Sequence, residues 1–188
     1  LELSNDVIFC GGNIKYSPGA AATARANIIS TDNWTITDGG VVGDPMTLVF
    51  NTNLSAGTTI TLPLYGTVNV TVDWGDSQPD TYNTNGDKTH TYASEGTYTV
   101  SITGTLTQFG NGYNEYANAD KLAKVTSFGS IGLASLYGAF RGTTNLTEVP
   151  SSLPPGILDL SYSFYGTGQE SITNLNSWEV SSVTDMGS

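Results

Sequence analysis

The last third of the chain contains an internal repeat, and no other feature restricts the fold as strongly. Phe140 and Phe164 occupy the same place in two matching runs, LYGAFRG and LSYSFYG. Further apolar pairs recur at nearly the same spacing: Leu122 with Leu146, Val125 with Val149, Leu133 with Ile157, Ile157 with Val183 and Leu160 with Met186. A period of about 25 residues is typical of a solenoid, in which each turn buries its apolar face against neighbouring turns.

The repeats occupy residues 121–188, and we expect the set to be incomplete because a third turn has only begun at Met186. A one-dimensional stack needs about three or more turns and polar end caps to be stable. We therefore expect further turns in a longer protein. We also expect residues 121–188 alone to show no cooperative thermal transition.

Residues 44–107 have the pattern of a small β-sandwich. Apolar and polar residues alternate with the period of two that half-buried strands require, in the segments 46–50, 59–64, 68–74 and 97–103. Turn-forming Gly, Asn, Asp and Pro separate these segments. We predict a sandwich that melts on its own, followed by a Gly-, Asn- and Tyr-rich linker at 108–120.

Residues 1–41 are expected to form a strand, a helix and a second strand. A short apolar run covers 7–9, and the alternating stretch 33–38 has the pattern of a strand. Between them, Ser17 and Pro18 fit the N-cap and first position of an alanine-rich helix over 20–29. Three short elements cannot enclose a core, so we expect them to close an array that precedes residue 1.

The balance of charge excludes several classes of partner. Lys and Arg number 6 against 17 Asp and Glu, and the net charge of −11 repels nucleic acids and anionic membranes. No run of about 18 apolar residues is present, so no membrane insertion is predicted in this segment. The content of charged residues, only 12%, fits an extracellular setting. The one cysteine, Cys10, is interpreted as a small core residue, and in an exported protein the lack of an internal disulfide points to a bacteria-like surface protein.

Two motifs within residues 72–100 resemble a known family. Asp73-Trp74-Gly75-Asp76 forms the first, and the run HTYASEGTYTV forms the second. They resemble the signature of the polycystic kidney disease (PKD) domain, an immunoglobulin-like β-sandwich, with Ser77 where that family more often has a second Gly. The resemblance implies a spacer or a protein- and glycan-contacting module without catalytic residues. The signature residues are Asp73, Trp74, Gly75, Asp76, His90, Tyr92, Gly96, Tyr98 and Val100.

The flanking segments resemble a second family. Residues 146–150, LTEVP, and 177–186, SWEVSSVTDM, are similar to the BspA-like surface leucine-rich repeats of bacteria, with Glu179 in place of the usual Asp. Residues 16–40 are similar to the segment that ends such an array. The resemblances imply a mainly β chain, in which a PKD-like sandwich lies between the end of one leucine-rich-repeat solenoid and the start of another.

Few residues of this chain suit catalysis or metal binding. His90 is the only histidine, and its place in the second motif favours a structural role. Asp73, Asp76 and Asp80 offer oxygen ligands for calcium but lack the spacing of an EF-hand, and Asp76 is better explained as the cap of its own turn. Acids on the repeats would serve glycoside hydrolysis only if two faced each other across a cleft. We predict no catalytic residue and no cofactor, with calcium open as an alternative.

Several tyrosines form a candidate contact surface, because they lie in or near the repeats and their rings could stack against a sugar or a protein partner. They are Tyr113, Tyr116, Tyr137, Tyr162 and Tyr165. An ordinary place in the core or on neutral surface is the alternative.

These observations predict a non-enzymatic segment of a large extracellular surface protein or adhesin, with rod-like spacing modules that contact protein or glycan ligands. Weak single sites on a regular face would bind multivalently. Two alternatives stay open. One is a structural fibre or filament protein, cellular or viral, formed by self-association; the other is a carbohydrate-binding accessory region of a secreted hydrolase.

Overall fold

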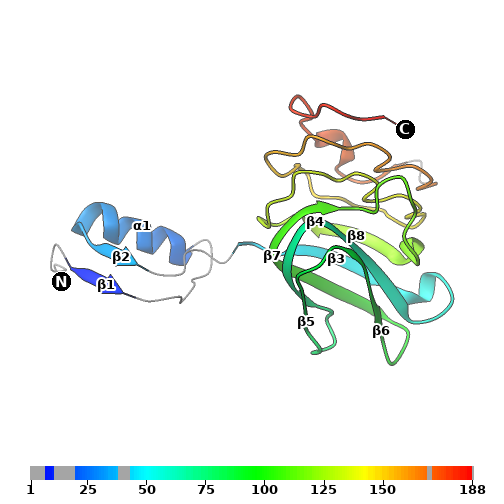
Figure 1. Cartoon of the computed structure of the whole chain (residues 1–188), viewed down its shortest axis with the longest axis horizontal. Helices are drawn as coiled ribbons and strands as arrows, with labels where there is room; N and C mark the ends of the chain where they lie inside the picture. Colours follow the sequence, from blue (N-terminus) through cyan, green and yellow to red (C-terminus); the bar gives the residue numbers. More distant parts are fainter. Residues whose placement is uncertain (1–6, 11–19, 38–42, 169–170, 188) are drawn as a thin grey trace. The chain divides into compact units, whose positions relative to one another are not determined.

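The computed structural model describes residues 7–10, 20–37, 43–168 and 171–187 (Figure 1). The chain is mainly β and divides into two compact units, Leu1–Asp44 and Pro45–Ser188, which are described separately below.

The first unit is a β-α-β element. Strands β1 (Ile8–Cys10) and β2 (Thr35–Thr37) pair in parallel with Ile8 opposite Thr35, and helix α1 (Ala20–Asp32) connects them. The order strand, helix, strand is the predicted one, although α1 runs beyond the expected end at residue 29. The predicted cap at Ser17 and Pro18 lies outside the described residues.

Strand β1 has no apolar cover among the described residues of its unit. Ile8 is 73% exposed, Phe9 is 52% exposed and Cys10 is exposed, so the expectation that Cys10 is a core residue was wrong. Arg25 of α1 donates through Nη2 to the carbonyl oxygen of Ile36 at 3.0 Å and thereby links the helix to β2. The unit thus holds its elements together but leaves an apolar strand open.

The second unit is built on an antiparallel sheet of six strands. The strands are β3 (Met46–Asn51), β4 (Thr59–Asp73), β5 (Asp80–Tyr82), β6 (Gly86–Thr91), β7 (Thr97–Phe109) and β8 (Leu122–Ser127). Their order is β5-β4-β7-β3-β8, and β6 also pairs with β4. Short 3-10 helices follow β3 at Thr52–Leu54 (η1), precede β8 at Ala119–Lys121 (η2) and lie near the C-terminus at Leu175–Ser177 (η3).

Two of the predicted strands are one strand in the structure. Residues 59–64 and 68–74 were expected as separate elements, but β4 runs through both and changes its pairing register with β7 between Tyr65 and Val68. Gly66 at this bend has φ +67°, a left-handed conformation that glycine adopts readily. β4 pairs with β6 over residues 59–64, with β7 over residues 64–73 and with β5 over residues 70–72.

After β8 the chain winds in successive superhelical turns, which we call coils. Neighbouring coils pair in parallel through single β-bridges. One ladder joins residues 108, 135, 159 and 185, and the other joins residues 124, 148 and 173. Each step spans about 25 residues, which is the period expected from the sequence repeat. Figure 1 shows these coils lying one above another over the sheet.

In both ladders of bridges, the first residue belongs to a strand of the sheet. Gln108 lies in β7 and Lys124 in β8, so each strand pairs with the sheet along part of its length and with a coil elsewhere. Phe109 N–H donates to the Ser135 carbonyl oxygen at 3.2 Å, and Val125 N–H donates to that of Glu148 at 2.9 Å. The coils therefore continue the hydrogen bonding of the sheet.

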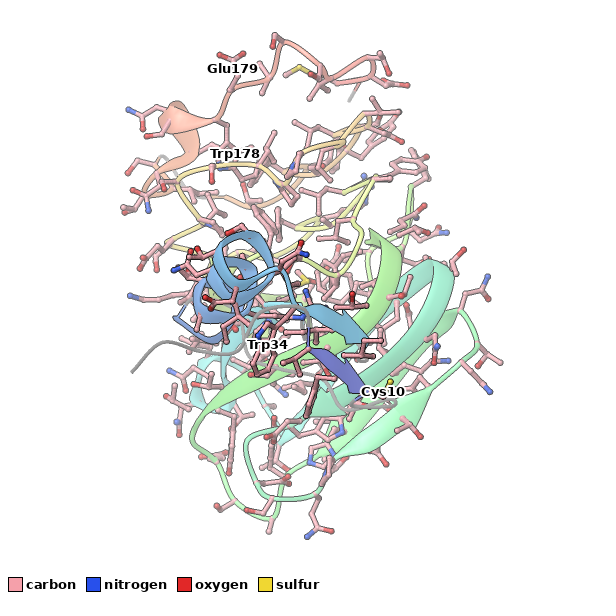
Figure 2. All side chains as sticks on the ribbon, turned by 90° about the vertical axis from the view of Figure 1, so that its left-hand side faces the viewer. Cys10, Trp34, Trp178 and Glu179 are labelled. Carbon is pink, nitrogen blue, oxygen red and sulfur yellow. The ribbon has the colours of Figure 1, made fainter. Side chains whose placement is uncertain are left out.

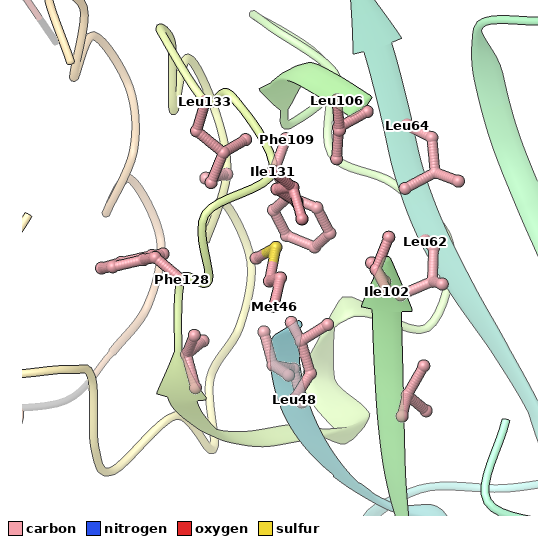
Figure 3. Packing of buried hydrophobic residues seen from close by; sticks show 14 of the residues in the cluster. Met46, Leu48, Leu62, Leu64, Ile102, Leu106, Phe109, Phe128, Ile131 and Leu133 are labelled. Atoms are coloured by element: carbon pink, nitrogen blue, oxygen red, sulfur yellow. The ribbon is translucent and has the colours of Figure 1, made fainter. Parts of the chain in front are cut away.

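A single apolar core extends from the sheet into the coils (Figure 3). Residues of the sheet, Met46, Leu106 and Phe109, pack in one cluster with residues of the first coil, Phe128, Ile131 and Leu133. Residues 44–107 lack the coil side of this core. We therefore expect that residues 44–107 do not melt independently, in contrast to the prediction from the sequence.

The stretch 108–120, predicted as a linker, is packed into the second unit. Phe109, Tyr116 and Ala119 are buried, and β7 itself extends to Phe109. The turn-forming composition of this stretch comes from positions that need positive φ, such as Gly110 and Asn118. It is a folded junction between the sheet and the coils.

Lys121, which follows this junction, is fully buried and fixes the loop before β4. Its Nζ donates to the carbonyl oxygens of Ala56, Gly57 and Thr59 at 3.0, 2.8 and 2.9 Å. These acceptors compensate for the cost of burying an ammonium group.

Polar side chains close equivalent turns of the coils. The side-chain oxygens of Ser135, Asp159 and Asp185 accept from the backbone N–H two positions further on, at 3.1, 2.8 and 3.0 Å. Such local bonds favour turns over extended strands. The bond from Gly187 also holds the pKa of Asp185 below its ordinary value.

Two asparagines connect successive turns. The Asn145 side-chain amide donates to the carbonyl oxygen of Asp120 at 2.8 Å, and that of Asn174 donates to the carbonyl oxygen of Val149 at 3.0 Å. Each acceptor lies one turn earlier in the chain than its donor. These bonds give each turn a fixed height above the previous one.

A comparison of two glycines tests how closely the turns stack. Gly138 has φ +66° and a Cβ there would overlap the carbonyl oxygen of Gly112, whereas Gly156 has φ +96° and no atom within 4 Å of a Cβ. We expect Gly156→Ala to cost about 1–2 kcal/mol, for the left-handed backbone alone. Gly138→Ala should lower the free energy of unfolding by at least about 2 kcal/mol more, measured by urea titration. Equal losses would contradict the close stacking.

Candidate functional site

The three aspartates considered for calcium serve the turn after β4. Gly75 N–H donates to Asp73 Oδ1 at 2.9 Å, and Gln78 N–H donates to Asp76 Oδ1 at 3.1 Å. The Trp74 indole donates to Asp80 Oδ2 at 2.9 Å. Within the described ranges, no group of three or more metal-ligating side chains is formed. The calcium candidates are therefore not brought together as a site.

The four aromatic residues of the predicted signature pack in one column. The Trp74 and His90 rings are stacked at 4.8 Å, His90 meets Tyr92 edge-on at 4.7 Å, and Tyr92 stacks on Tyr98 at 3.5 Å. His90 Nε2 also lies 2.7 Å from Asp76 Oδ2. The only histidine is thus held between two rings and a carboxylate.

Tyr92 closes this column through a buried hydrogen bond. Its hydroxyl donates to the carbonyl oxygen of Trp74 at 2.8 Å. Burial raises the pKa of the Tyr92 phenol above its ordinary value of 10.0, and the negative charge of Asp76 adds to the effect. The folded chain therefore keeps this proton under alkaline conditions in which the unfolded chain loses it.

The raised pKa sets the sign of a pH-dependent effect. Tyr92→Phe should lower the free energy of unfolding at pH 7 by about 1–3 kcal/mol, because the Trp74 carbonyl loses its donor. The contribution of the phenol is fully present below the unfolded pKa, near 10, and is lost as pH rises towards the folded value. Urea unfolding at pH 7 and pH 10.5 should therefore show a smaller difference between the two proteins at the higher pH. A constant difference would contradict the assignment.

The five predicted contact tyrosines differ in their exposure to solvent. Tyr113 is 60% exposed and Tyr165 is 54% exposed, while Tyr137 and Tyr162 are half-buried. Tyr116 is only 1% exposed, and its hydroxyl donates to the carbonyl oxygen of Ala139 at 3.3 Å. Its place on the contact surface was wrong, because the segment that carries it is packed against the coils.

Three of the four other tyrosines lie around Arg141, and the fourth, Tyr137, contacts one of these three. We call these five residues the tyrosine–arginine cluster. The guanidinium carbon of Arg141 lies 4.2 Å from the ring centre of Tyr165, 5.0 Å from that of Tyr113 and 5.7 Å from that of Tyr162. Tyr162 in turn contacts the rings of Tyr113 at 5.1 Å and of Tyr137 at 6.1 Å. Arg141 Nη1 is buried and has no hydrogen-bond partner among the residues that the structure describes.

Sequence reasoning missed Arg141, although the repeat contained the signal. Arg141 and Tyr165 directly follow the repeated Phe140 and Phe164, whose rings lie 5.2 Å apart. Residues at equivalent positions of neighbouring turns lie one above the other, so the repeat implies that the arginine faces the tyrosine.

The backbone of Tyr162 occupies an unusual conformation at the centre of this cluster. Its φ is +53°, and Gly138 at the equivalent position of the previous turn has φ +66°. A left-handed backbone costs about 1–2 kcal/mol for a residue with a side chain. The stack therefore holds a bulky aromatic residue where glycine would be less strained.

A second surface feature is an apolar groove on the last described coil. It has a volume of about 530 Å³, and its lining includes Leu160, Phe164, Trp178 and Met186. Tyr162 and Tyr165 of the tyrosine–arginine cluster also line it, so the groove adjoins the cluster. The Trp178 indole donates to the carbonyl oxygen of Pro150 at 2.7 Å, whereas Glu179 beside it is exposed (Figure 2). Glu179 Oε1 accepts from Ser181 N–H at 3.0 Å and so closes a turn as Asp159 and Asp185 do.

Comparisons with protein-family models, with curated proteins and with solved structures found no match. In the part of the chain that the structure describes, no helix has the length and apolar character needed to cross a membrane. The fold, the cluster and the groove are therefore the features that bear on function.

Proposed function

We propose that this chain is a non-enzymatic segment of a large bacterial surface protein or adhesin. In this proposal a PKD-like sandwich separates the end of one leucine-rich-repeat array from the start of another. The modules act outside the cell as a rod-like spacer and present protein- or glycan-contacting faces at set intervals. The low content of charged residues favours this location, and the single cysteine fits a bacterial surface protein that folds without an internal disulfide.

The observation that carries the proposal is a gradient of burial along equivalent positions. Leu136, Leu160 and Met186 occupy the same position in successive turns and are 0%, 8% and 61% exposed. Burial falls as the number of covering turns falls, as expected for a stack in which each turn is covered by the next. We propose that a further turn covers the apolar groove and that the coils are part of a longer solenoid.

The first unit fits the other end of such an arrangement. The parallel pairing of β1 and β2 joins Ile8 to Thr35, and the spacing of this pair along the chain equals that of Gln108 and Ser135 in the second unit. The exposed Ile8 and Phe9 leave room for a preceding turn. We propose that this unit is the closing turn of an upstream array.

A non-enzymatic role is supported by the contacts of His90. A catalytic histidine needs a free ring nitrogen aimed at a substrate or nucleophile. A bond to a carboxylate, such as the 2.7 Å contact of His90 Nε2 with Asp76, occurs in both catalytic and structural histidines. The ring of His90, however, is stacked on Trp74 at 4.8 Å and meets Tyr92 edge-on at 4.7 Å. These contacts favour a structural role over proton transfer.

Duplication of a turn tests the proposal. Three tandem copies of residues 136–159, inserted after Asp159 in a protein of residues 43–188, should extend the ladders in register. We expect the maximum dimension from X-ray scattering to grow by about 14 Å, because neighbouring strands lie about 4.7–4.8 Å apart. The insert should also sharpen the thermal transition, since each turn adds an interface.

A protein with the same three inserts in scrambled order is the matched control and should gain a flexible loop instead. Flexible scattering from the ordered inserts, as from the scrambled ones, would contradict a stack of additive turns.

Self-association into a fibre is a second candidate function, which the apolar groove favours. An exposed apolar surface can be covered by another copy of the chain as well as by a further turn. Sedimentation velocity separates the two: polymers that grow with concentration favour the fibre, and a monomer at all concentrations favours the spacer.

A further inference from the structure

We propose that the tyrosine–arginine cluster binds an acidic sugar, with the sugar carboxylate on Arg141 and its ring on the exposed tyrosines. This inference rests on the proposed function, because it names the ligand class of the contact surface. It concerns Tyr113, Tyr137, Arg141, Tyr162 and Tyr165, and it adds a charged residue to a surface that the sequence indicated only through its aromatic residues.

Within the described part of the second unit, Arg141 differs from the other cations in lacking an oxygen partner. Lys121 donates to backbone carbonyls, Lys124 pairs with Glu148 at 2.9 Å, and Lys88 lies 3.4 Å from Thr84 Oγ1. The guanidinium of Arg141 has only aromatic rings as partners among the described residues. An unneutralised cation in a chain of net charge −11 is well placed to attract a single carboxylate.

The geometry of the guanidinium fits that ligand. Its central carbon lies over the Tyr165 ring at 4.2 Å from the ring centre. A carboxylate accepts two parallel N–H bonds from the edge of a guanidinium group. Nη1 is covered in the free chain and lacks an acceptor, which is unfavourable for a buried donor. Rotation of an exposed tyrosine side chain, common when ligands bind, would open Nη1 to the carboxylate.

The tyrosines provide the surface for the sugar ring. More than half of Tyr113 and Tyr165 is exposed, and an aromatic ring with a hydroxyl offers both an apolar face and a hydrogen-bonding edge. Between them Tyr162 is fixed by its left-handed backbone and by the bond from its N–H to the Gly187 carbonyl oxygen at 2.8 Å. The aromatic surface thus has a fixed tyrosine, Tyr162, between two exposed tyrosines, Tyr113 and Tyr165, whose side chains are free to adjust to a ligand.

The charge of the chain narrows the ligand further. A net charge of −11 repels densely sulfated polyanions, whereas one carboxylate flanked by neutral sugars meets less repulsion. Glu115, whose carboxyl group contacts Gly142, adds to this selection near Arg141. We therefore infer a glycan with isolated carboxylates, such as one that alternates uronic acid and neutral sugars.

The test compares two matched probes by isothermal titration calorimetry on the full chain. One is a tetrasaccharide that alternates glucuronic acid with a neutral amino sugar, and the other is the same tetrasaccharide with its carboxyls reduced to alcohols. We expect a Kd of about 1 mM for the acidic probe and at least about tenfold weaker binding of the reduced probe. Equal binding of the two probes, or binding of neither, would overturn the inference.

Variants identify the residues. Arg141→Gln should weaken the acidic probe at least about tenfold and leave the reduced probe nearly unchanged, Tyr165→Ala should weaken both, and Lys124→Gln should change neither. If Arg141→Gln lowers the melting temperature, the double change of the exposed residues, Tyr113→Ala with Tyr165→Ala, provides the second test and should abolish binding in a folded chain.

Two results distinguish sugar binding from binding of a protein partner and from the proposed function. A glutamate-rich peptide that binds in place of the sugar, with the same dependence on Arg141, would overturn the sugar assignment in favour of a protein partner. Failure of the turn duplication concerns the proposed function alone, because sugar binding to Arg141 does not require additional turns.

Discussion

Two strands of this protein belong to two systems of hydrogen bonds at once. β7 pairs with β4 and β3 and then, past residue 105, with the first coil; β8 pairs with β3 and with the coil around Glu148. A parallel stack of coils lacks cover at its ends, and here the sheet covers one of them. Because both ladders start on strands whose positions the sheet fixes, the register of every later turn follows from the register of β7 and β8.

The coils depend on this start because their own bonds are sparse. Each turn contributes single bridges, a buried apolar side chain and a few side-chain bonds, such as those of Asn145 and Asn174 to the previous turn. Such contacts are worth about 1 kcal/mol apiece and must offset the entropy of ordering a whole turn of the chain. Burial at equivalent positions decreases away from the sheet, from Leu136 to Met186, as expected when each turn is covered only by its neighbours.

The sequence predicted the repeat well because a period is a local property that can be read from Phe140 and Phe164. It also predicted the alternating strands, since a half-buried strand needs alternation. It did not predict that Tyr116 and Phe109 are core residues, because their burial depends on contacts with Ala139 and with the coil at Ser135. The exposure of Cys10 and the ring contacts of Arg141 were not predicted for the same reason, because both depend on segments distant in the chain. The composition of residues 108–120 indicated a flexible linker. In the structure the glycine and asparagine residues of this stretch occupy positions with positive φ, such as Gly110 and Asn118.

Scanning calorimetry of residues 44–188 and of residues 44–107 tests the shared core most directly. If sheet and coils form one unit, the longer protein unfolds in a single transition whose calorimetric and van't Hoff enthalpies agree, and the shorter one shows no cooperative transition. An independent transition of residues 44–107, at the temperature at which the sheet unfolds in the longer protein, would contradict this account. The sheet would then be a separate domain, and the ladders would not depend on it.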